Sequence, residues 1–179
     1  IGPKSQCSVP QLFIDNNTID RVHVFKLLGV NIDDKLKWNS HVKAICSKAS
    51  ARLHFLKQLK RSGVSADDLL HFYVTVIRTV LEFACPVWHK SLTVDSANQI
   101  ETVQKRAINI IYSNCNYREV CAQINLPTLF DRREELCESF FKDMYNSTNC
   151  LNYLLPLPRH NDIVNKLRHC YKLAPITAK

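Results

Sequence analysis

Glycine is scarce in this sequence, and its scarcity excludes several kinds of site. Only Gly2, Gly29 and Gly63 occur among 179 residues. Phosphate-cradling loops and dinucleotide-binding turns need several glycines within one short segment, because glycine lets the backbone approach a phosphate closely. Three isolated glycines cannot supply such a loop. We therefore expect no cofactor and no small-molecule ligand.

The sequence also lacks the cysteine spacing of a metal site. None of its eight cysteines belongs to a C-x-x-C pair, and the closest two, Cys115 and Cys121, have five residues between them. Zinc sites commonly take ligands from closely spaced pairs, so we expect no metal centre. The positions of Cys46 and Cys137 on apolar helix faces indicate free thiols that pack as small hydrophobic side chains. Free thiols fit a reducing compartment, so we expect a location inside the cell, in cytoplasm or nucleus.

Long apolar runs and targeting signals are absent as well. A membrane-spanning helix needs about 20 apolar residues, and the longest apolar stretch, residues 72–87, is interrupted by Arg78, Glu82 and Pro86. The chain begins at Ile1, and no succession of basic, apolar and small residues follows as in a secretory signal. We expect no membrane contact, and we interpret the chain as a piece of a longer polypeptide.

No combination of residues predicts autonomous catalysis. Paired carboxylates can hold the metal ions of a polymerase, but Asp33-Asp34 is expected to form a turn and Asp67-Asp68 to cap a helix that starts at Ser65. An iron site of two histidines and one carboxylate has only His160-Asn161-Asp162 to draw on. No nucleophile is placed on a sharp turn. We therefore expect that the chain is not an enzyme by itself.

Acidic residues are missing from one segment, and this absence points to a partner. Eight Lys or Arg residues and no Asp or Glu lie between Lys35 and Arg61, so this segment carries the whole formal charge of +8. A basic element on a neutral body is typical of proteins that bind a polyanion, most often nucleic acid. A merely solvated helix face has the same composition, and charge alone does not separate the two interpretations.

The residue pattern predicts a mainly α fold with a short β element at its start. Residues 18–33 are rich in β-branched and aromatic side chains, and Gly29 within them indicates a short hairpin or a bent strand. The apolar spacing then becomes helical, from a cap at Asn39 or Ser40 to Gly63. Trp38 precedes this cap, and we expect it to be buried at the junction.

Further helices follow with short connections. A second helix is expected from Ser65 to a kink or stop at Pro86, and a third helix is expected to begin near Asp95 or Ser96. Connections of four to eight residues predict that these helices are antiparallel neighbours in a three-helix bundle. A short helix near residues 118–124 and a longer one capped by Thr128 and Asp131 come next. The residues expected on the buried side of this last helix are Leu129, Leu136, Cys137, Phe140 and Met144.

A series of short motifs runs in order through residues 18–144. The motifs are Phe25-Lys26-Leu27-Leu28-Gly29-Val30, Ile32-Asp33, Leu36, Trp38, His41-Val42, Lys48-Ala49, Arg52-Leu53, Phe55-Leu56, Phe72-Tyr73, Ile77-Arg78, Val80-Leu81-Glu82, Ala84-Cys85-Pro86-Val87-Trp88-His89, Gln104-Lys105-Arg106-Ala107, Leu126-Pro127-Thr128-Leu129 and Arg132-Arg133. Each motif alone is weak, but their succession is specific. It resembles the region just downstream of the catalytic palm in LINE-type, non-LTR retrotransposon reverse transcriptases.

This resemblance implies a role in holding a template–primer duplex, either RNA–DNA or DNA. In that family the Leu-Gly turn belongs to the primer grip and the following helices form the thumb, which implies a grip made by Phe25, Leu28 and Gly29. The implied contacts to the nucleic-acid backbone are Lys43, Lys48, Arg52, Lys57, Lys60 and Arg61. Such contacts set position and affinity without reading sequence, as a polymerase requires.

The resemblance also implies a division of the chain and a missing partner. It gives a palm remnant and grip-like segment in residues 1–34, a thumb-like bundle in 35–113, connector helices in 114–147 and a partly ordered tail in 148–179. The aromatic-x-Asp-Asp motif of the family is absent from this sequence. We therefore expect the upstream palm and fingers of the parent polymerase as a partner, and no polymerisation by this fragment alone.

A second resemblance and a second function class remain open. Residues 22–61 are similar to a segment named after the N-terminal part of an AlkB-like dioxygenase and tRNA methyltransferase. Neither chemistry is expected, because the iron ligands and a glycine-rich loop are both absent. The alternative function is a helical protein-interaction module that docks a partner in an apolar groove. Salt dependence of nucleic-acid binding separates this alternative from the thumb interpretation.

Overall fold

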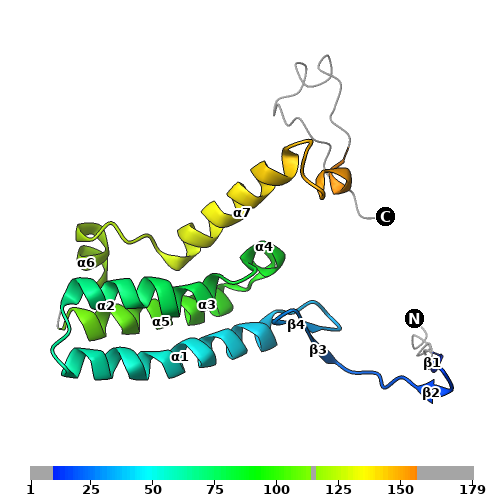
Figure 1. Cartoon of the computed structure of the whole chain (residues 1–179), viewed down its shortest axis with the longest axis horizontal. Helices are drawn as coiled ribbons and strands as arrows, with labels where there is room; N and C mark the ends of the chain where they lie inside the picture. The colour runs from blue at the N-terminus through cyan, green and yellow to red at the C-terminus, as the bar shows by residue number, and fades with distance from the viewer. Residues whose placement is uncertain (1–9, 114–115, 157–179) are drawn as a thin grey trace, which may run out of the picture.

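A bundle of three helical segments forms the centre of the computed structural model, which describes residues 10–113 and 116–156 (Figure 1). The first segment is α1 (Asn39–Arg61). The second is continuous but irregular, with α2 (Ala66–Phe72), the π-helical η1 (Tyr73–Arg78) and α3 (Thr79–Glu82), and the third is α5 (Val94–Ile111). The prediction of a mainly α fold with a short β element is confirmed. The predicted palm remnant in residues 1–8, the tail beyond 156 and His160-Asn161-Asp162 lie outside the described residues.

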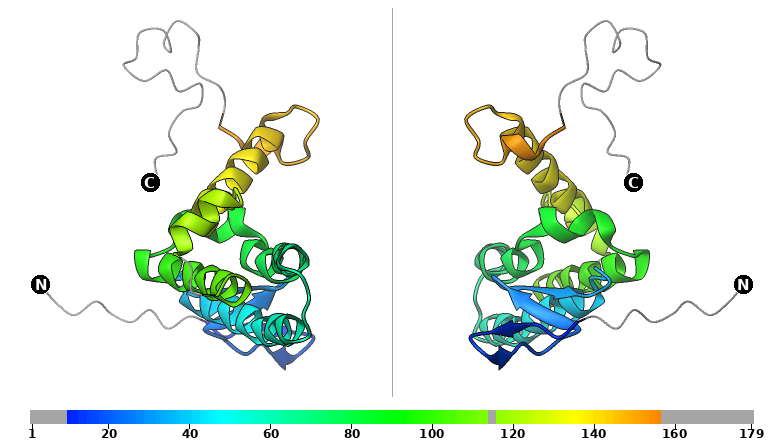
Figure 2. Two further views of the ribbon diagram at one scale, coloured as in Figure 1. Left: turned by 90° about the vertical axis from the view of Figure 1, so that its left-hand side faces the viewer. Right: turned by 90° about the vertical axis from the view of Figure 1, so that its right-hand side faces the viewer.

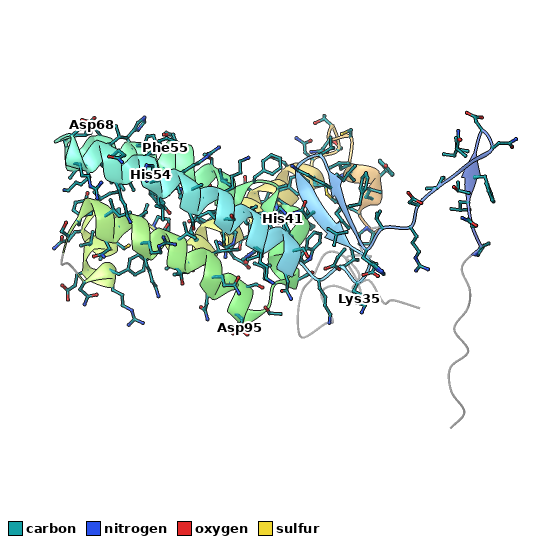
Figure 3. All side chains as sticks on the ribbon, turned by 90° about the horizontal axis from the view of Figure 1, so that it is seen from below. Lys35, His41, His54, Phe55, Asp68 and Asp95 are labelled. Atoms are coloured by element: carbon teal, nitrogen blue, oxygen red, sulfur yellow. The ribbon has the colours of Figure 1, made fainter. Side chains whose placement is uncertain are left out.

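The first and third helices run parallel, with the second segment antiparallel to both. Near their starts, the Ser96 hydroxyl donates to the Asn39 side chain at 3.1 Å. Near their ends, the Lys60 ammonium donates to the carbonyl of Ile111 at 2.9 Å. Consecutive helices are thus antiparallel as expected, and α1 and α5 lie side by side (Figure 3). Residues from all three segments are fully buried between them, among them Val42, Ala49, Leu56, Leu69, Tyr73, Ile77, Leu81, Ile100 and Ala107.

The segment before the bundle forms two small hairpins. The first pairs β1 (Phe13–Ile14) with β2 (Asn17–Thr18), and the second pairs β3 (Val24–Leu27) with β4 (Val30–Asp33). The turn of the second hairpin is Leu28-Gly29, with φ angles of 46° and 90°. Positive φ at both central residues is the backbone that matches the twist of a two-residue hairpin. Of the two predicted forms, the hairpin is therefore the correct one.

The entry to α1 differs from the predicted cap. The residue at the cap position is Trp38, without a side-chain capping bond, whereas Asn39 or Ser40 was expected. The Asp33 carboxylate organises the preceding turn by accepting from the backbone N–H groups of Lys35 at 3.0 Å and Lys37 at 2.7 Å. Trp38 is only 7% exposed, which confirms its predicted burial. Tertiary packing of this indole places the helix start one residue earlier than capping preferences alone suggest.

The starts of the other helices agree better with the capping residues that the sequence predicts. The Ser65 hydroxyl accepts from the Asp68 N–H at 3.2 Å and donates to the Asp68 carboxylate at 2.7 Å, which confirms the predicted capping pair. Thr128 caps α7 (Leu129–Tyr145) in the same way, through Asp131. The third helix, α5, begins at Val94, one residue before the start expected near Asp95, and its cap is Thr93, which accepts from the Ser96 N–H. Gly63 follows the end of α1 with a φ of 81°, as expected.

The stretch Ala66–Ser91, which extends past the end of the second helical segment, is 26 residues long and passes for a membrane-spanning helix by length and composition alone. The interruptions noted in the sequence, Arg78, Glu82 and Pro86, lie within it. In the fold, the segment packs on α1 and α5 and keeps an ion pair of 3.1 Å between Arg78 and Glu82. Ala84, with a φ of 53°, breaks it before α4 (Cys85–Trp88) and η2 (His89–Ser91), at the predicted position next to Pro86.

Two helices and a final turn complete the described chain. These are α6 (Tyr117–Gln123), α7, and η3 (Asn152–Leu154). The N-terminal half of α7 packs on α4 and α5, where Leu129 and Arg133 are fully buried, and its C-terminal half leaves the bundle (Figures 1 and 2). Phe140, predicted to be buried, is therefore 43% exposed, because no neighbouring element of the described chain extends that far.

A buried polar network fastens α6 and α7 to the bundle. The Tyr73 hydroxyl donates to the Gln104 amide oxygen at 2.6 Å, and the Gln104 amide nitrogen donates to the Tyr117 hydroxyl at 2.8 Å. The Glu101 carboxylate accepts from the Tyr117 hydroxyl and from the backbone N–H of Leu129 at 2.9 Å. Burial raises the pKa of Tyr73 well above its usual range. Because buried polar groups are costly without partners, this chain of bonds fixes how α7 docks.

The two positive-φ glycines provide a matched test of the hairpin. A Cβ on Gly29 would lie 3.2 Å from the Phe83 ring, whereas a Cβ on Gly63 would meet nothing within 4 Å. The left-handed backbone alone makes either Gly→Ala change cost about 1–2 kcal/mol. We expect Gly29→Ala in addition to loosen the hairpin, with faster amide hydrogen exchange at Asn31. Gly63→Ala should leave that exchange unchanged, and equal exchange in the two variants would contradict the packing of Gly29 on Phe83.

Candidate nucleic-acid interface

A cavity of about 520 Å³ opens between the β3–β4 hairpin and the bundle. Strand, turn, α1 and α3 all contribute to its wall. The lining residues are Lys26, Gly29, Asn31, His41, Ala44, Ile45, Lys48, Arg52, Thr79, Val80 and Phe83. Three of these are cations, and none of these described lining residues is a carboxylate. We call this cavity the hairpin groove.

The cations of the hairpin groove come from two elements. Lys26 lies on β3, while Lys48 and Arg52 are one turn apart on α1. The Arg52 guanidinium is half-buried and donates to the carbonyl of Val76 in the π-helical turn. Lys26 and Lys48 are exposed. The groove therefore presents one fixed and two adjustable positive charges to the solvent.

His41 joins the hairpin to α1 at the floor of the groove (Figure 3). Its Nδ1 accepts a hydrogen bond from the backbone N–H of Asn31 at 3.3 Å, so the ring acts as an acceptor at this atom. The ring is 1% exposed and stands between the indoles of Trp38 and Trp88, with centroids at 6.3 and 5.4 Å. Burial lowers the pKa of His41, because desolvation disfavours the charged imidazolium. The hairpin is thus held by a neutral histidine.

The three residues of the implied primer grip are only partly brought together. Gly29 lines the hairpin groove and packs against Phe83. Leu28 is 88% exposed at the tip of the turn, and Phe25 is exposed on the strand. Neither Leu28 nor Phe25 belongs to the lining of the groove.

The six implied backbone contacts divide between the two flanks of α1. Lys48 and Arg52 face the hairpin groove. Lys43, Lys57 and Arg61 are exposed on the flank that faces α5, because they lie within about 20° of Ser50 at 100° per residue, and Ser50 accepts from Arg106 of α5 at 3.4 Å. Lys60 donates to the carbonyl of Ile111, which leaves it partly engaged in helix packing.

Sequence reasoning missed residues that the fold adds to these surfaces. Lys26 enters the groove from the strand, and Phe83 supplies its apolar wall, although neither was singled out for this role. Arg106 joins the opposite flank from α5. Lys26 and Arg106 lay within quoted motifs, but only the pairing of distant elements shows that their side chains approach α1.

A second cluster of polar side chains joins η2 to α7. Glu134 accepts from His89 at 2.8 Å and from Lys90, and the buried Arg133 donates to His89 at 3.3 Å and lies over the Trp88 ring. Within residues 10–113 and 116–156, no group of three or more His, Cys, Asp or Glu side chains is arranged to hold a metal ion. The described cysteines Cys46, Cys85, Cys121, Cys137 and Cys150 are free thiols.

Comparison with known proteins gives a distant relationship. The chain is 24% identical over 129 residues to the probable RNA-directed DNA polymerase from transposon X-element of Drosophila melanogaster, which covers 68% of this chain and 14% of that protein. The chain therefore spans a small part of that relative. No protein-family model and no solved structure matches the chain, so the resemblance to the AlkB-like segment gains no support. The similarity does support a relationship to a retrotransposon RNA-directed DNA polymerase.

The neutral state of His41 predicts how stability changes with pH. An unfolded histidine binds a proton near pH 6.5, and the pKa of folded His41 is lower. Below about pH 6.5 the unfolded state binds more protons, so the free energy of unfolding falls as the pH falls through this window. His41→Gln keeps an acceptor but cannot titrate there. Urea unfolding between pH 7.5 and 5 should show a smaller decline for His41→Gln than for the parent.

A second buried histidine, His89, limits how much His41→Gln can reduce the pH dependence of the free energy of unfolding. Its pKa is also lowered by burial, against the opposing influence of Glu134. A residual decline should therefore persist in the His41→Gln variant. An undiminished pH dependence would show that His41 is not held in its neutral form by the fold.

Proposed function

We propose that this chain is part of a non-LTR retrotransposon reverse transcriptase and serves there as a thumb-like element that grips the template–primer duplex. The observation that carries the proposal is the hairpin groove, where Lys26, Lys48 and Arg52 line a cavity next to Gly29 with no carboxylate among the lining residues. The distant similarity to the X-element polymerase supports the same assignment.

The chemistry of the hairpin groove suits a phosphate backbone. Cations on a rigid helix and a strand neutralise phosphates and release counterions, which gives affinity without sequence preference. Arg52 is fixed by Val76, and Lys26 and Lys48 have flexible stems that adapt to different positions along a duplex. A polymerase needs such adaptable contacts, because its duplex advances with each nucleotide.

We infer that catalysis takes place in another part of the parent polymerase. One aspartate of each Asp-Asp pair already has a structural role, since Asp33 organises a turn and Asp68 pairs with the helix cap Ser65. The hairpin exposes Val24, Phe25, Leu27 and Leu28, each at least 45% accessible. We propose that this apolar surface contacts the upstream palm and fingers of the parent polymerase.

The second candidate function is a protein-interaction module, and the end of α7 favours it. Phe140, Phe141 and Tyr145 are each more than 40% exposed there. A second cavity, of about 480 Å³, is lined by Pro86, Lys90, Cys137, Glu138, Phe140, Phe141, Lys142 and Met144. Its mostly apolar lining fits a protein partner better than a nucleic acid.

Salt dependence tests the thumb proposal. We expect the full chain to bind a 12-base-pair RNA–DNA duplex with an affinity that falls as salt rises. Each phosphate contact contributes about −0.9 to the slope of log K against log salt, so Lys26→Ala with Lys48→Ala should make the slope about 1.8 units shallower. Fluorescence anisotropy at four salt concentrations measures both slopes.

A charge-matched control separates groove contacts from net charge. Arg118→Ala with Lys142→Ala removes the same charge from exposed positions on α6 and α7, and it should leave the slope close to that of the parent. If both double variants behave alike, or if the parent binds no duplex even at low salt, the protein-interaction function is preferred.

A further inference from the structure

The flank of α1 that faces α5 carries a second basic surface, separate from the hairpin groove. We define this α1–α5 surface by Lys43, Ser50, Lys57 and Arg61 of α1 and Arg106 of α5. The Arg106 guanidinium donates to the Ser50 hydroxyl at 3.4 Å, which brings its charge onto the same surface. Figure 3 shows α1 and α5 side by side, both on the side of the molecule seen in that view.

The cations of the α1–α5 surface form a line. Lys43, Ser50 and Lys57 are spaced by seven residues, so they turn by only about 20° per step and rise by about 21 Å in total. A duplex carries one phosphate charge per 1.7 Å of its axis, or about 12 over this distance. A duplex that lies along α1 could therefore contact several of these side chains at once.

Little on this surface opposes an anion. In the part of the chain that the structure describes, no carboxylate is within ion-pair distance of Lys43, Lys57, Arg61 or Arg106. Asp95 is in the first turn of α5, and its neighbour Ser96 donates to Asn39, so this carboxylate lies near the N-terminal part of α1. The surface beyond it remains positive.

The side chains favour a duplex over a single strand. Proteins that bind single strands stack bases on exposed aromatic rings. Among the aromatic side chains of α1, His54 is the closest to Ser50 around the helix, about 40° away, and it is hydrogen-bonded to Gln58 at 3.4 Å and pairs edge to face with Phe55. A single ring that already contacts Gln58 and Phe55 offers bases no surface on which to stack. Lysines, arginines and a hydroxyl instead match the phosphates of a double helix.

We propose that the α1–α5 surface binds the phosphate backbone of a second nucleic-acid duplex while the hairpin groove holds the first. The two sites lie on opposite flanks of α1, since Lys48 is about 160° from Ser50 around the helix. This proposal extends the proposed function, because it assigns a second substrate segment to the same helix. A polymerase fragment with both sites would hold two duplex segments of a folded or branched template together.

Stoichiometry tests the second site. The full chain is titrated calorimetrically with an excess of a 12-base-pair RNA–DNA duplex at low salt, and we expect two duplexes per chain. Lys43→Ala, Lys57→Ala and Arg106→Ala together should reduce this to one, because the second site loses three phosphate contacts. Helical content by circular dichroism should stay unchanged, because Ala propagates a helix well.

The Lys26→Ala, Lys48→Ala variant separates the two proposals. If it also binds one duplex, and the combination of all five substitutions binds none, both sites exist. If the parent chain binds one duplex, and both sets of substitutions weaken that binding, a single duplex straddles α1. This result would overturn the second site alone. If the parent chain and the Lys43→Ala, Lys57→Ala, Arg106→Ala variant both bind two duplexes, the second site is also overturned. Failure of only the groove variant to change binding would overturn the groove proposal and leave the α1–α5 surface standing.

Discussion

The packing of Trp88 between His41 and Arg133 is the interaction on which the rest of the structure depends. The indole is fully buried, and its N–H donates to the carbonyl of Phe83 at 3.0 Å, which fixes the break after α3. His41 lies 5.4 Å from the indole and holds the hairpin through Asn31. Arg133 lies 5.8 Å from it and brings α7 onto the bundle. One side chain thus positions both extensions of the helical core.

This arrangement explains why several residues of the motifs that carry the resemblance are buried. Tyr73, Trp88, His89, Gln104 and Arg133 all belong to those motifs, and all are less than 10% exposed. They form hydrogen bonds and ring contacts that dock separate elements, so they determine the shape of the scaffold. Other residues of the same motifs, among them Lys26, Lys48 and Arg106, are exposed on the surface of that scaffold, and they are among the proposed nucleic-acid contacts.

Most of the helical fold could be predicted from local signals. Ser65 with Asp68 and Thr128 with Asp131 each cap a helix within three residues, so their chemistry is local and readable. The predictions failed where distant packing prevailed. Trp38 occupies the cap position of α1 because its indole packs on His41, and Phe140 is exposed because α7 runs past the bundle. The π-helical turn at Tyr73–Arg78 has no periodicity that apolar spacing reveals.

The sequence by itself determined that one short segment would carry all the excess positive charge, since eight cations without an acid between Lys35 and Arg61 need no fold to be counted. Only the tertiary structure decided how those cations are divided. Docking of the hairpin through His41 brings Lys26 to Lys48 and Arg52, and the parallel pairing of α1 with α5 brings Arg106 to the opposite flank. The physical reason is that charge is a property of composition, whereas a binding surface requires contacts between elements far apart along the chain.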